Sequence, residues 1–413
     1  MTNTHPTTTF FGLGIAPKVL EALERMKFQV PTPIQHKAIP LAVEGKDIMG
    51  IAQTGTGKTL AFAIPMVQRL AQGTSCGLIV VPTRELALQV DETIRKVALP
   101  FGIKSTVLIG GASMEEQIRD IKKGARILVA TPGRLIDHLQ RGTARLNNVA
   151  ILVLDEADRM FDMGFAPQIE QILREVPKER QTMLFSATMP RDIMVMAGRH
   201  MKLPINIEVA PQGTAAENVV QEIFVVKREA KTVLLQKLLG EYRGSVLLFS
   251  RTKHGARKLT RDIKVMGHSA AEIHSDKTLA QRRQALEGFK VGRYRVLVAT
   301  DIAARGIDVK GIELVINFDL PDDAENYVHR IGRTGRAGMA GRAISIATPD
   351  QADLIQAIEK ILRSQIKQAQ HPDVETHTLY RPPASGSGSS GRSSGGGRSF
   401  VNRTLARGRR RFR

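Results

Sequence analysis

Residues 52–59 read AQTGTGKT and have the composition of a loop that binds phosphate. They follow the pattern of a glycine, four residues and Gly-Lys-Thr, except that an alanine takes the place of the first glycine. Gly55 and Gly57 permit a tight turn in which successive backbone N–H groups face a phosphate, and a helix that begins near Lys58 adds its N-terminal dipole. The Lys58 ammonium would reach the β- and γ-phosphates of a nucleotide, and the Thr59 hydroxyl would be a ligand of Mg²⁺. A purely structural strand-to-helix turn is the alternative.

An acidic segment follows a second apolar run. Residues 149–154 are apolar, and they lead directly into Asp155, Glu156 and Asp158. Carboxylates at the end of a buried strand cost free energy unless they serve a cation or a reaction. Asp155 is placed to hold Mg²⁺, directly or through water, and Glu156 is placed as the general base that orients and deprotonates an attacking water. A solvated first helical turn is the alternative, and the preceding phosphate-binding loop weighs against it.

The elements that must position these groups follow from the apolar pattern. Short continuous runs alternate with longer amphipathic segments, which is typical of strands buried on both faces of a parallel sheet and of helices that cover it. Two such series predict two α/β domains, with ligands at the carboxyl ends of the strands. We expect strands at 47–52, 77–81, 127–130, 149–154 and 182–185, then at 245–249, 295–299, 314–317 and 343–347, and helices that include 85–97, 115–122 and 231–239.

Charge and composition divide the chain further. The 413 residues hold 60 Lys and Arg against 40 Asp and Glu, and the net charge of +20 favours a polyanionic partner, nucleic acid before an anionic membrane. Residues 376–413 contain nine Arg, no acidic residue and many Gly and Ser, so we interpret them as a disordered tail that either binds nucleic acid or is merely solvated. The predicted parts are an N-terminal segment (1–29), a first domain (30–210), a linker (211–217), a second domain (218–370) and the tail (371–413).

The cysteine count and the lack of long apolar runs restrict the cellular location of the protein. Cys76 is the only cysteine, which excludes an intramolecular disulfide and a Cys-rich zinc site and fits a reducing cytosol. No apolar run approaches the roughly 18 residues that a membrane span needs. The N-terminal residues lack the charged and apolar regions of a secretory signal. We therefore expect a cytoplasmic protein without a membrane partner.

The sequence of residues 155–158 is DEAD, and the chain resembles the DEAD-box ATP-dependent RNA helicases of superfamily 2 over about residues 10–365. The resemblance implies two tandem RecA-like domains, each a parallel sheet flanked by helices, with ATP and Mg²⁺ as ligands. It also implies RNA as the partner, held through its backbone with little sequence specificity. The implied activity is ATP hydrolysis coupled to local, non-processive duplex unwinding or to remodelling of RNA–protein complexes. Short length, plain motifs and a basic tail are most similar to the bacterial RhlE-like branch.

The resemblance extends the nucleotide site. Residues 30–35, VPTPIQ, look like the family's Q motif, in which the Gln35 amide reads the adenine edge and Phe28 packs on the base. Phe10 is similar to the family's isolated upstream aromatic, whereas Lys27 stands where the family usually has Gly. From the residues alone, 31–35 would be a loop and Phe28 a core residue. The expected nucleotide contacts are Phe28, Gln35, Ala52, Gln53, Thr54, Gly55, Thr56, Gly57, Lys58, Thr59, Gly306 and Asp308.

Residues 329–338, HRIGRTGRAG, resemble the family segment that carries arginine fingers. Arg333 and Arg336 are three residues apart, which predicts that one helical face carries both. By resemblance they stabilise the charge that develops on the γ-phosphate. A solvated basic face is the alternative. The expected catalytic residues are Lys58, Asp155, Glu156, Arg333 and Arg336.

Motifs in both domains resemble the family's contacts with the RNA backbone. They supply Arg charge, Thr hydroxyls and exposed backbone N–H groups, and none offers a pair of groups that reads a base. Each can also be interpreted as a structural turn or cap. In 274–283, Ser275 and Leu279 stand where the family often has Gly and Gln, so only Arg282 is kept as a contact. The expected RNA contacts are Pro82, Thr83, Arg84, Gly110, Gly111, Thr131, Pro132, Gly133, Arg134, Arg251, Arg282 and Thr300.

A third group of residues is expected to couple hydrolysis to strand separation. By resemblance, the hydroxyls of the SAT segment, 186–188, hydrogen-bond toward Asp158. From the sequence alone this segment would be a Ser/Thr helix cap. Asp301 and Arg305 are expected to organise their loop. The expected coupling residues are Asp158, Ser186, Thr188, Asp301, Arg305, His329 and Arg330.

Two other functions stay open. A DNA helicase or translocase of the same superfamily would share the loop, the carboxylates and the arginines, although Gln35 and the SAT and DEAD spellings favour RNA. A non-catalytic RNA chaperone could act through the tail, although the intact Lys58 and Glu156 argue against it. The physiological RNA is not readable from the sequence. The resemblance suggests proteins of RNA degradation or ribosome assembly as partners, and we expect a monomer.

Overall fold

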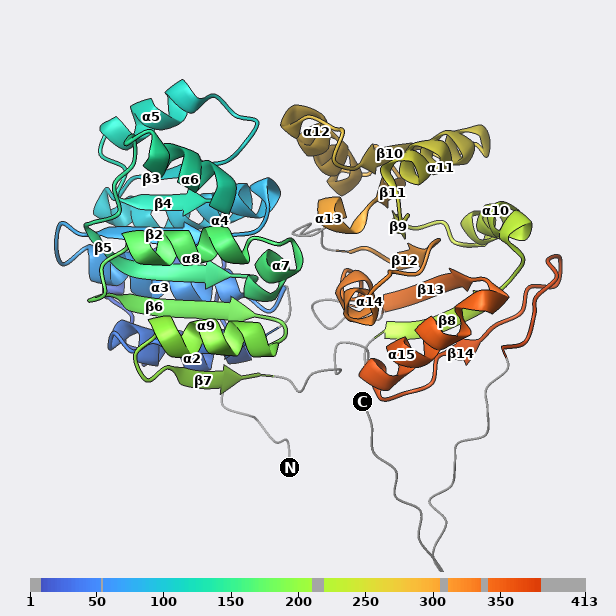
Figure 1. Ribbon diagram of the computed structural model, residues 1–413, viewed down its shortest axis with the longest axis horizontal. Helices are drawn as coiled ribbons and strands as arrows, with labels where there is room; N and C mark the ends of the chain where they lie inside the picture. The colour runs from blue at the N-terminus through green and yellow to red at the C-terminus, as the bar shows by residue number, and fades with distance from the viewer. Residues whose placement is uncertain (1–8, 53–54, 210–218, 305–310, 336–340, 380–413) are drawn as a thin grey trace, which may run out of the picture. The chain divides into compact units, whose positions relative to one another are not determined.

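The computed structural model describes residues 9–52, 55–209, 219–304, 311–335 and 341–379. Within these residues the chain forms two parallel sheets, and helices cover both faces of each (Figure 1). This arrangement confirms the expected pair of α/β domains. In the same ranges, no helix has the length and apolarity needed to cross a membrane.

The first sheet has seven strands within the described residues, all parallel, in the order β3-β4-β2-β5-β6-β1-β7. The strands are β1 (Ile48–Ile51), β2 (Cys76–Val80), β3 (Ser105–Leu108), β4 (Ile127–Ala130), β5 (Val149–Asp155), β6 (Gln181–Ser186) and β7 (Ile205–Glu208). The helices are α1 (Pro17–Arg25), α2 (Pro33–Val43), α3 (Lys58–Leu70), α4 (Arg84–Ala98), α5 (Met114–Lys122), α6 (Pro132–Gln140), α7 (Ala157–Asp162), α8 (Ala166–Glu175) and α9 (Arg191–His200).

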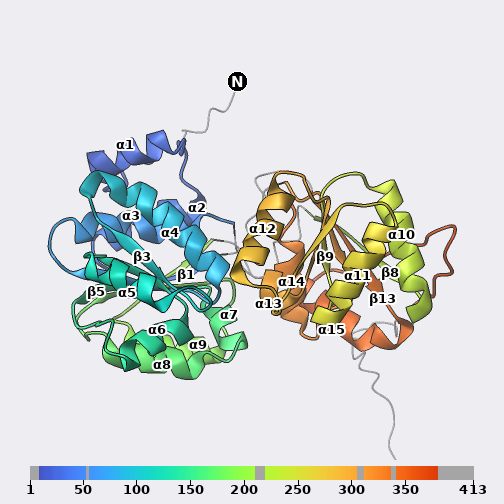
Figure 2. The ribbon, with the colours of Figure 1, turned by 90° about the horizontal axis from the view of Figure 1, so that it is seen from above.

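Side chains alternate between two cores across this sheet. In β5, Ile151 and Val153 pack with α3 and α4, whereas Leu152 and Leu154 pack with α6 and α8 on the other face. Figure 2 shows α1, α3 and α4 on one side of the sheet and α6, α8 and α9 on the other. Because both faces are buried, the central strands need apolar residues at every position, which explains their continuous apolar runs.

The second sheet also has seven strands within the described residues, all parallel, in the order β10-β11-β9-β12-β13-β8-β14. The strands are β8 (Val219–Val225), β9 (Val246–Phe249), β10 (Ala270–Ile273), β11 (Val296–Ala299), β12 (Leu314–Asn317), β13 (Gly341–Ala347) and β14 (Lys367–Gln368). The helices are α10 (Lys231–Glu241), α11 (Lys253–Val265), α12 (Leu279–Lys290), α13 (Asp301–Ala304), α14 (Ala324–Ile331) and α15 (Ala352–Leu362).

The two sheets have the same topology. Numbered from the first strand of each domain, both follow the order 3-4-2-5-6-1-7. β8 therefore corresponds to β1, β12 to β5 and β13 to β6. This correspondence makes a position-by-position comparison of the two domains possible.

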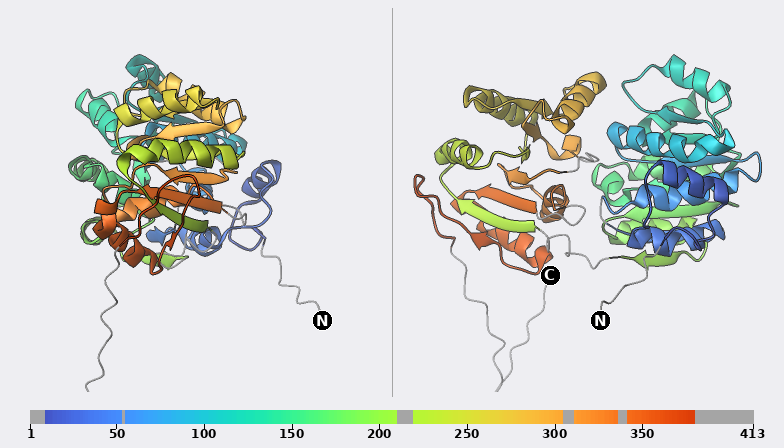
Figure 3. Two further views of the ribbon diagram at one scale, coloured as in Figure 1. Left: turned by 90° about the vertical axis from the view of Figure 1, so that its right-hand side faces the viewer. Right: turned by 180° about the vertical axis from the view of Figure 1, so that it is seen from behind.

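The second domain extends beyond its predicted end at residue 370. β14 pairs with β8, the His377 N–H donates to the Val225 carbonyl at 2.7 Å, and Leu379 is buried in the core. The dark red end of the described chain follows this edge of the sheet (Figure 3). Residues 371–379 therefore belong to the domain and not to the tail. The linker 211–217 and residues 380–413 lie outside the described residues.

Candidate functional site

The phosphate-binding loop lies between β1 and α3. Gly55 and Gly57 both have φ of +90°, the left-handed region that favours glycine, and α3 begins at Lys58 as predicted. A Cβ on Gly57 would collide with the Gln35 amide. The loop therefore requires glycine at this position for conformation and for space. Gln53 and Thr54 lie outside the described residues.

Lys58 connects this loop to the acidic segment. Its side chain is buried, and its ammonium donates to the Ala52 carbonyl at 2.9 Å and lies 4.0 Å from Asp155 Oδ1. A buried ammonium between a carbonyl and a carboxylate is held in place before any anion arrives. The Lys58 ammonium is therefore ordered at the end of the loop, and its contact with phosphate stays a prediction.

Asp155 and Glu156 are both buried at the end of β5, so the interpretation of a solvated helix start is wrong. Glu156 has φ of +54°, a left-handed conformation that a non-glycine residue adopts at a cost. Its N–H donates to Asp155 Oδ1 at 2.9 Å, and Arg159 donates to Glu156 Oε2 at 2.6 Å. This strained turn orients the two carboxylates individually.

The two carboxylates differ in acidity. Burial raises the pKa of Asp155 to about 6, against the opposing charge of Lys58. Burial also acts to raise the pKa of Glu156, but the charges of Arg159 and Lys58 outweigh it, so that this pKa lies below its ordinary value. Glu156 is therefore kept ionised, as a general base must be. Arg159 was not among the expected site residues, although its position three residues after Glu156, in the first turn of α7, was a usable signal.

The donor set at this site suits Mg²⁺ bound together with a nucleotide. Within the described ranges, no three His, Cys, Asp or Glu side chains gather as they would for a metal held by protein alone. Mg²⁺ usually takes one or two carboxylates together with phosphate oxygens and water, and Asp155 and Thr59 offer one carboxylate and one hydroxyl. Burial penalises the charge of Asp155, and a nearby cation would relieve that penalty.

Gln35 ties the Q motif to the phosphate-binding loop. Its Oε1 accepts from the Thr32 N–H at 2.9 Å, and its Nε2 donates to the Gly57 carbonyl at 3.0 Å. α2 begins at Pro33, so a loop over 31–35, as the residues alone predicted, is wrong. Phe28 is 40% exposed and is not a core residue, whereas Phe10 is buried. The reading of adenine by Gln35 stays a prediction.

Lys27 takes the conformation expected of the glycine that it replaces. Its φ is +61°, and the Phe28 N–H donates to the Leu23 carbonyl at 2.9 Å, which closes the end of α1. A lysine in this region costs more than a glycine. The turn that presents Phe28 is therefore retained despite the substitution.

The SAT segment contacts the acidic segment as the resemblance implied. The Asp158 N–H donates to Ser186 Oγ at 3.0 Å, and Asp158 Oδ2 accepts from the N–H of Thr188 at 2.9 Å and from its Oγ1 at 3.3 Å. The helix-cap interpretation is wrong, because α9 begins only at Arg191 and Pro190 occupies the cap position. The contact is present, and its coupling role stays a prediction.

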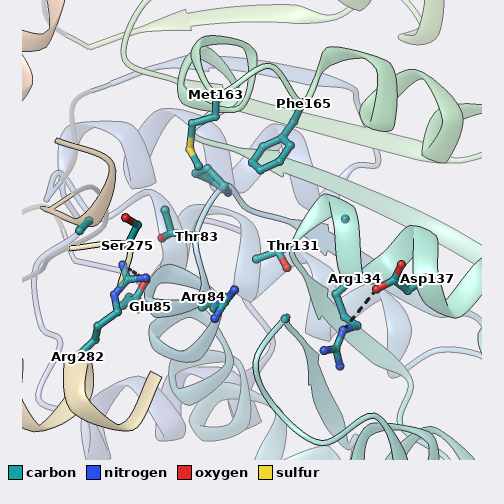
Figure 4. A pocket seen from close by; sticks show the side chains of 14 residues that line it. Thr83, Arg84, Glu85, Thr131, Arg134, Asp137, Met163, Phe165, Ser275 and Arg282 are labelled. Carbon is teal, nitrogen blue, oxygen red and sulfur yellow. Dashed lines mark hydrogen bonds and ion pairs between the residues drawn. The ribbon is translucent and has the colours of Figure 1, made fainter. Parts of the chain in front are cut away.

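The three RNA motifs of the first domain converge on one surface (Figure 4). The Arg84 guanidinium lies so close to the glycine pair that a Cβ on Gly111 would be 2.5 Å from it and one on Gly110 3.3 Å. Arg134 donates to the Ala112 carbonyl at 3.1 Å, and the Thr131 N–H donates to the Leu108 carbonyl at 3.0 Å. One pocket is lined by Pro82, Thr83, Arg84, Gly110, Thr131, Gly133 and Arg134 among others.

Two of the predicted RNA contacts, Thr83 and Pro132, also have structural roles. Thr83 Oγ1 accepts from the Leu86 N–H at 3.3 Å and caps α4, and Pro132 is buried at the start of α6.

Below the surface, His138 Nε2 lies 3.1 Å from Gln117 Oε1, and the Gln117 amide donates to the Ile109 carbonyl at 3.0 Å. Sequence reasoning missed this buried support, because its partners are brought together only by the fold.

In the second domain, carboxylates hold the arginines of the predicted RNA motifs. Asp319 Oδ2 accepts from Ser250 Oγ at 3.3 Å and from the Arg251 N–H at 3.0 Å, while Arg251 Nε lies 3.2 Å from Asp322 Oδ1. Arg282 donates to Glu85 Oε2 at 3.0 Å (Figure 4). Arg282 is therefore engaged by a carboxylate here, and its RNA contact stays a prediction.

Arg330 links the finger segment to its neighbours. It contacts both oxygens of Asp301, at 2.6 and 2.7 Å, and also donates to Asn317 Oδ1 at 3.2 Å and to the Asp319 carbonyl. Thr300, the residue before Asp301, donates from its backbone N–H to the Ile273 carbonyl at 3.3 Å.

The prediction that one helical face carries both finger arginines is wrong. α14 ends at Ile331, and Arg333 lies in the following turn, where it is 3% exposed and its Nε donates to the His329 carbonyl at 3.3 Å. Arg333 and Arg159 line the same small cavity. The remaining predicted site residues, Arg305, Gly306, Asp308 and Arg336, lie outside the described residues.

Known proteins resemble the chain over both domains. The family described as "DEAD/DEAH box helicase" matches residues 32–196, and "Helicase conserved C-terminal domain" matches 230–338. The DEAD-box ATP-dependent RNA helicase CshA of Geobacillus kaustophilus is 44% identical over 371 residues, which are 89% of this chain and 79% of the relative. The ATP-dependent rRNA helicase RRP3 of Debaryomyces hansenii is 42% identical over 368 residues, which are 88% and 77%.

Solved structures show the same likeness. S. cerevisiae Dbp5 bound to RNA and ADP BeF3 is 33% identical, with 88% of this chain and 95% of that chain covered and a TM-score of 0.80. Mss116p bound to ssRNA and AMP-PNP is 28% identical, with 89% and 80% covered and a TM-score of 0.79. The predicted fold of two tandem RecA-like domains is confirmed.

Proposed function

The chain belongs to the DEAD/DEAH box helicase family and is an ATP-dependent RNA helicase, and on this premise we propose which of its residues perform each step. The observation that carries the proposal is the junction of the phosphate-binding loop with the acidic segment. Lys58 and Asp155 are both buried there, with 4.0 Å between Nζ and Oδ1. Neither group would be stable in isolation, and together they form a preorganised site for a nucleotide phosphate and its cation.

Hydrolysis uses one base and several cations. Glu156, held by Arg159 and kept ionised, orients the attacking water and takes its proton. Lys58 holds the β- and γ-phosphates, and Arg333 and Arg336 stabilise the charge that develops during transfer. Thr59 and Asp155 would hold Mg²⁺, which would supply further charge stabilisation. Gln35 and Phe28 select adenine.

RNA is held by its backbone and is read without much sequence preference. Arg84, Arg134 and the glycine pair form the first-domain surface, and Arg251, Arg282 and Thr300 belong to the second. Closure of the two domains around ATP would complete the catalytic set only when RNA is bound. Asp158 and the SAT segment would transmit that coupling through the hydrogen bonds described above. Bending of one bound strand then unwinds a short duplex locally.

The finer assignments rest on composition and resemblance. We propose membership of the RhlE-like branch from the plain motifs and the Gly, Ser and Arg-rich residues 380–413. The single cysteine supports a cytoplasmic location. We propose a monomer that assists ribosome assembly or RNA degradation. The name of the yeast relative, an rRNA helicase, supports the first of these roles.

The deciding experiment measures ATP hydrolysis by the full chain with single-stranded RNA, with single-stranded DNA and without nucleic acid. We expect stimulation by RNA alone, because only RNA offers a 2′-OH. Unwinding of a short and a long duplex in parallel tests for local action, and we expect only the short one to separate. Stimulation by DNA equal to that by RNA would contradict the proposal. Annealing activity that survives Lys58→Ala would show an additional chaperone function.

A further inference from the structure

The shared topology identifies a second lysine–carboxylate pair in the place of the nucleotide-binding one. Lys58 is the first residue of the helix that follows β1, and Asp155 ends β5. Lys231 is the first residue of α10, the helix that follows β8, and Asp319 comes two residues after the end of β12. Because β8 and β12 correspond to β1 and β5, the two pairs occupy equivalent places. The second pair is also close, with 3.6 Å between Lys231 Nζ and Asp319 Oδ1.

The second pair is not built to hold phosphate. Residues 226–230, which precede Lys231, contain no glycine and include a short 3-10 helix. The Lys231 ammonium is buried, donates to the Phe318 carbonyl at 2.8 Å and lies 5.4 Å from the centre of the Phe318 ring. Without a turn that presents successive N–H groups, an anion has no cradle here. The cation is directed at the segment that carries Asp319.

Asp319 uses its other oxygen to hold a turn that faces RNA in the proposed function. Oδ2 accepts from Ser250 Oγ at 3.3 Å and from the Arg251 N–H at 3.0 Å, while Oδ1 faces Lys231. Its backbone carbonyl accepts from Arg330 of the finger segment. One residue therefore contacts the turn after β9, the start of α10 and the finger segment, and its two carboxylate oxygens have different partners.

We propose that Asp319, oriented by Lys231, is a positioning residue that sets the turn at Ser250 and Arg251 for RNA. The second domain thus keeps the lysine–carboxylate geometry of the first and uses it for RNA instead of ATP. The inference rests on the proposed RNA contact of Arg251. A carboxylate that accepts from a backbone N–H fixes the turn more closely than an exposed ion pair does, because the N–H cannot rotate away.

The sign of the effect separates positioning from plain electrostatics. Asp319→Asn and Asp322→Asn each remove one negative charge beside Arg251, and simple charge arguments predict tighter RNA binding for both. Positioning predicts the opposite for Asp319→Asn, because an amide has only one acceptor oxygen. With that oxygen toward Ser250 and Arg251, the NH2 group faces the Lys231 ammonium, and with the oxygen toward Lys231 the turn loses its acceptor. Asp322 pairs with the Arg251 side chain at an exposed site and is the matched control.

The test measures ATP hydrolysis against RNA concentration at saturating ATP, and against ATP concentration at saturating RNA. For Asp319→Asn we expect the half-saturating RNA concentration to rise about tenfold, which is ~1.4 kcal/mol, with kcat and the KM for ATP within about twofold of wild type. For Asp322→Asn, the half-saturating RNA concentration should stay unchanged or fall slightly. If Asp319→Asn does not fold, Ser250→Ala removes one of the two donors and should raise the RNA requirement by a smaller factor.

Three outcomes would overturn the inference. Unchanged or tighter RNA binding in Asp319→Asn, with Arg251→Ala impaired, would refute positioning by Asp319 and leave the RNA role of Arg251 intact. Arg251→Ala with wild-type RNA dependence would instead remove the proposed RNA contact, and the inference with it. A KM for ATP that rises as much as the RNA requirement would show a general structural defect and also refute the proposal.

Discussion

The two domains have the same strand order and differ in the connection between the first strand and the helix that follows it. In the first domain, two left-handed glycines precede Lys58, so backbone N–H groups can face a phosphate. In the second, residues 226–230 have no glycine, so no such turn precedes Lys231, although both lysines donate to a backbone carbonyl. The comparison teaches that a lysine near an aspartate is not by itself a nucleotide site. The glycine loop makes it one.

The largest effect should come from the second domain's contribution to hydrolysis. Arg333→Ala removes a finger arginine and should reduce kcat by ~10³-fold or more, because one of the cations that stabilise the charge developing on the γ-phosphate is lost. Steady-state hydrolysis at saturating ATP and RNA measures it. Arg342 of β13, whose guanidinium pairs with Glu222 of the neighbouring strand β8, supplies the control Arg342→Ala. A loss below about tenfold would mean that the first domain catalyses hydrolysis without help, and the division of labour would fail.

Glu156→Gln tests the base that belongs to the first domain alone. The amide keeps the shape of the side chain and cannot take a proton, so kcat should fall by roughly 10²–10⁴-fold. Binding of ATP and RNA should persist, and filter binding in the presence of a non-hydrolysable analogue would show it. Substantial RNA-stimulated hydrolysis in this variant would exclude Glu156 as the base.

Equivalent lysines should give different results when each is replaced by methionine. Lys58→Met should raise the KM for ATP about 10- to 100-fold, since hydrogen bonds to charged groups contribute ~1.5–3 kcal/mol. Lys231→Met should leave the KM for ATP unchanged and raise the RNA requirement. Both variants are compared in the same hydrolysis assay, with thermal melting as a check of folding. Equal effects on ATP would mean that the second pair also binds nucleotide.

The smallest effect should follow truncation after Leu379, which removes nine Arg and no acidic residue and spares residues 371–379 that pack on the second domain. RNA affinity should fall several-fold at low salt, and its dependence on salt should flatten, because fewer counterions are released. The kcat at saturating RNA should stay as in the full chain. Identical salt slopes for the two chains would show that these arginines do not contact RNA.

Much of the fold was predictable because buried strands carry their own signal. Each expected strand is present, and residues 127–130 and 314–317 match β4 and β12 without a shift. The strands β3 and β10 were missed. Each lies at a sheet edge and is only partly buried, so its residues do not form a continuous apolar run. β7 and β14 were missed at the other edges for the same reason. β8, which lies between β13 and β14, was also missed, because Gln221 and Glu222 interrupt its apolar run.

The candidate site divides in the same way. Lys58, Asp155 and Glu156 could be named from local patterns, because the loop, the strand and the acidic residues that form the site are short contiguous segments. Gln117, His138 and Lys231 could not be named in this way. Their partners are distant in the sequence, and a partner that accepts through its backbone carbonyl can be any residue type, so the sequence does not reveal it. The course of the chain after α14 was also misjudged, because the spacing of two arginines does not reveal where a helix ends.

The sequence by itself determined the chemistry of this protein: a glycine loop, two carboxylates and a basic partner segment, each of which requires particular residue types at particular spacings. Only the tertiary structure decided how those groups are used. It buried Lys58 beside Asp155, placed Lys231 beside Asp319, and gave Lys27 and Glu156 left-handed conformations that glycine would more often adopt. The physical reason is that charge and conformational cost depend on burial and on neighbours, and both are properties of the packed fold.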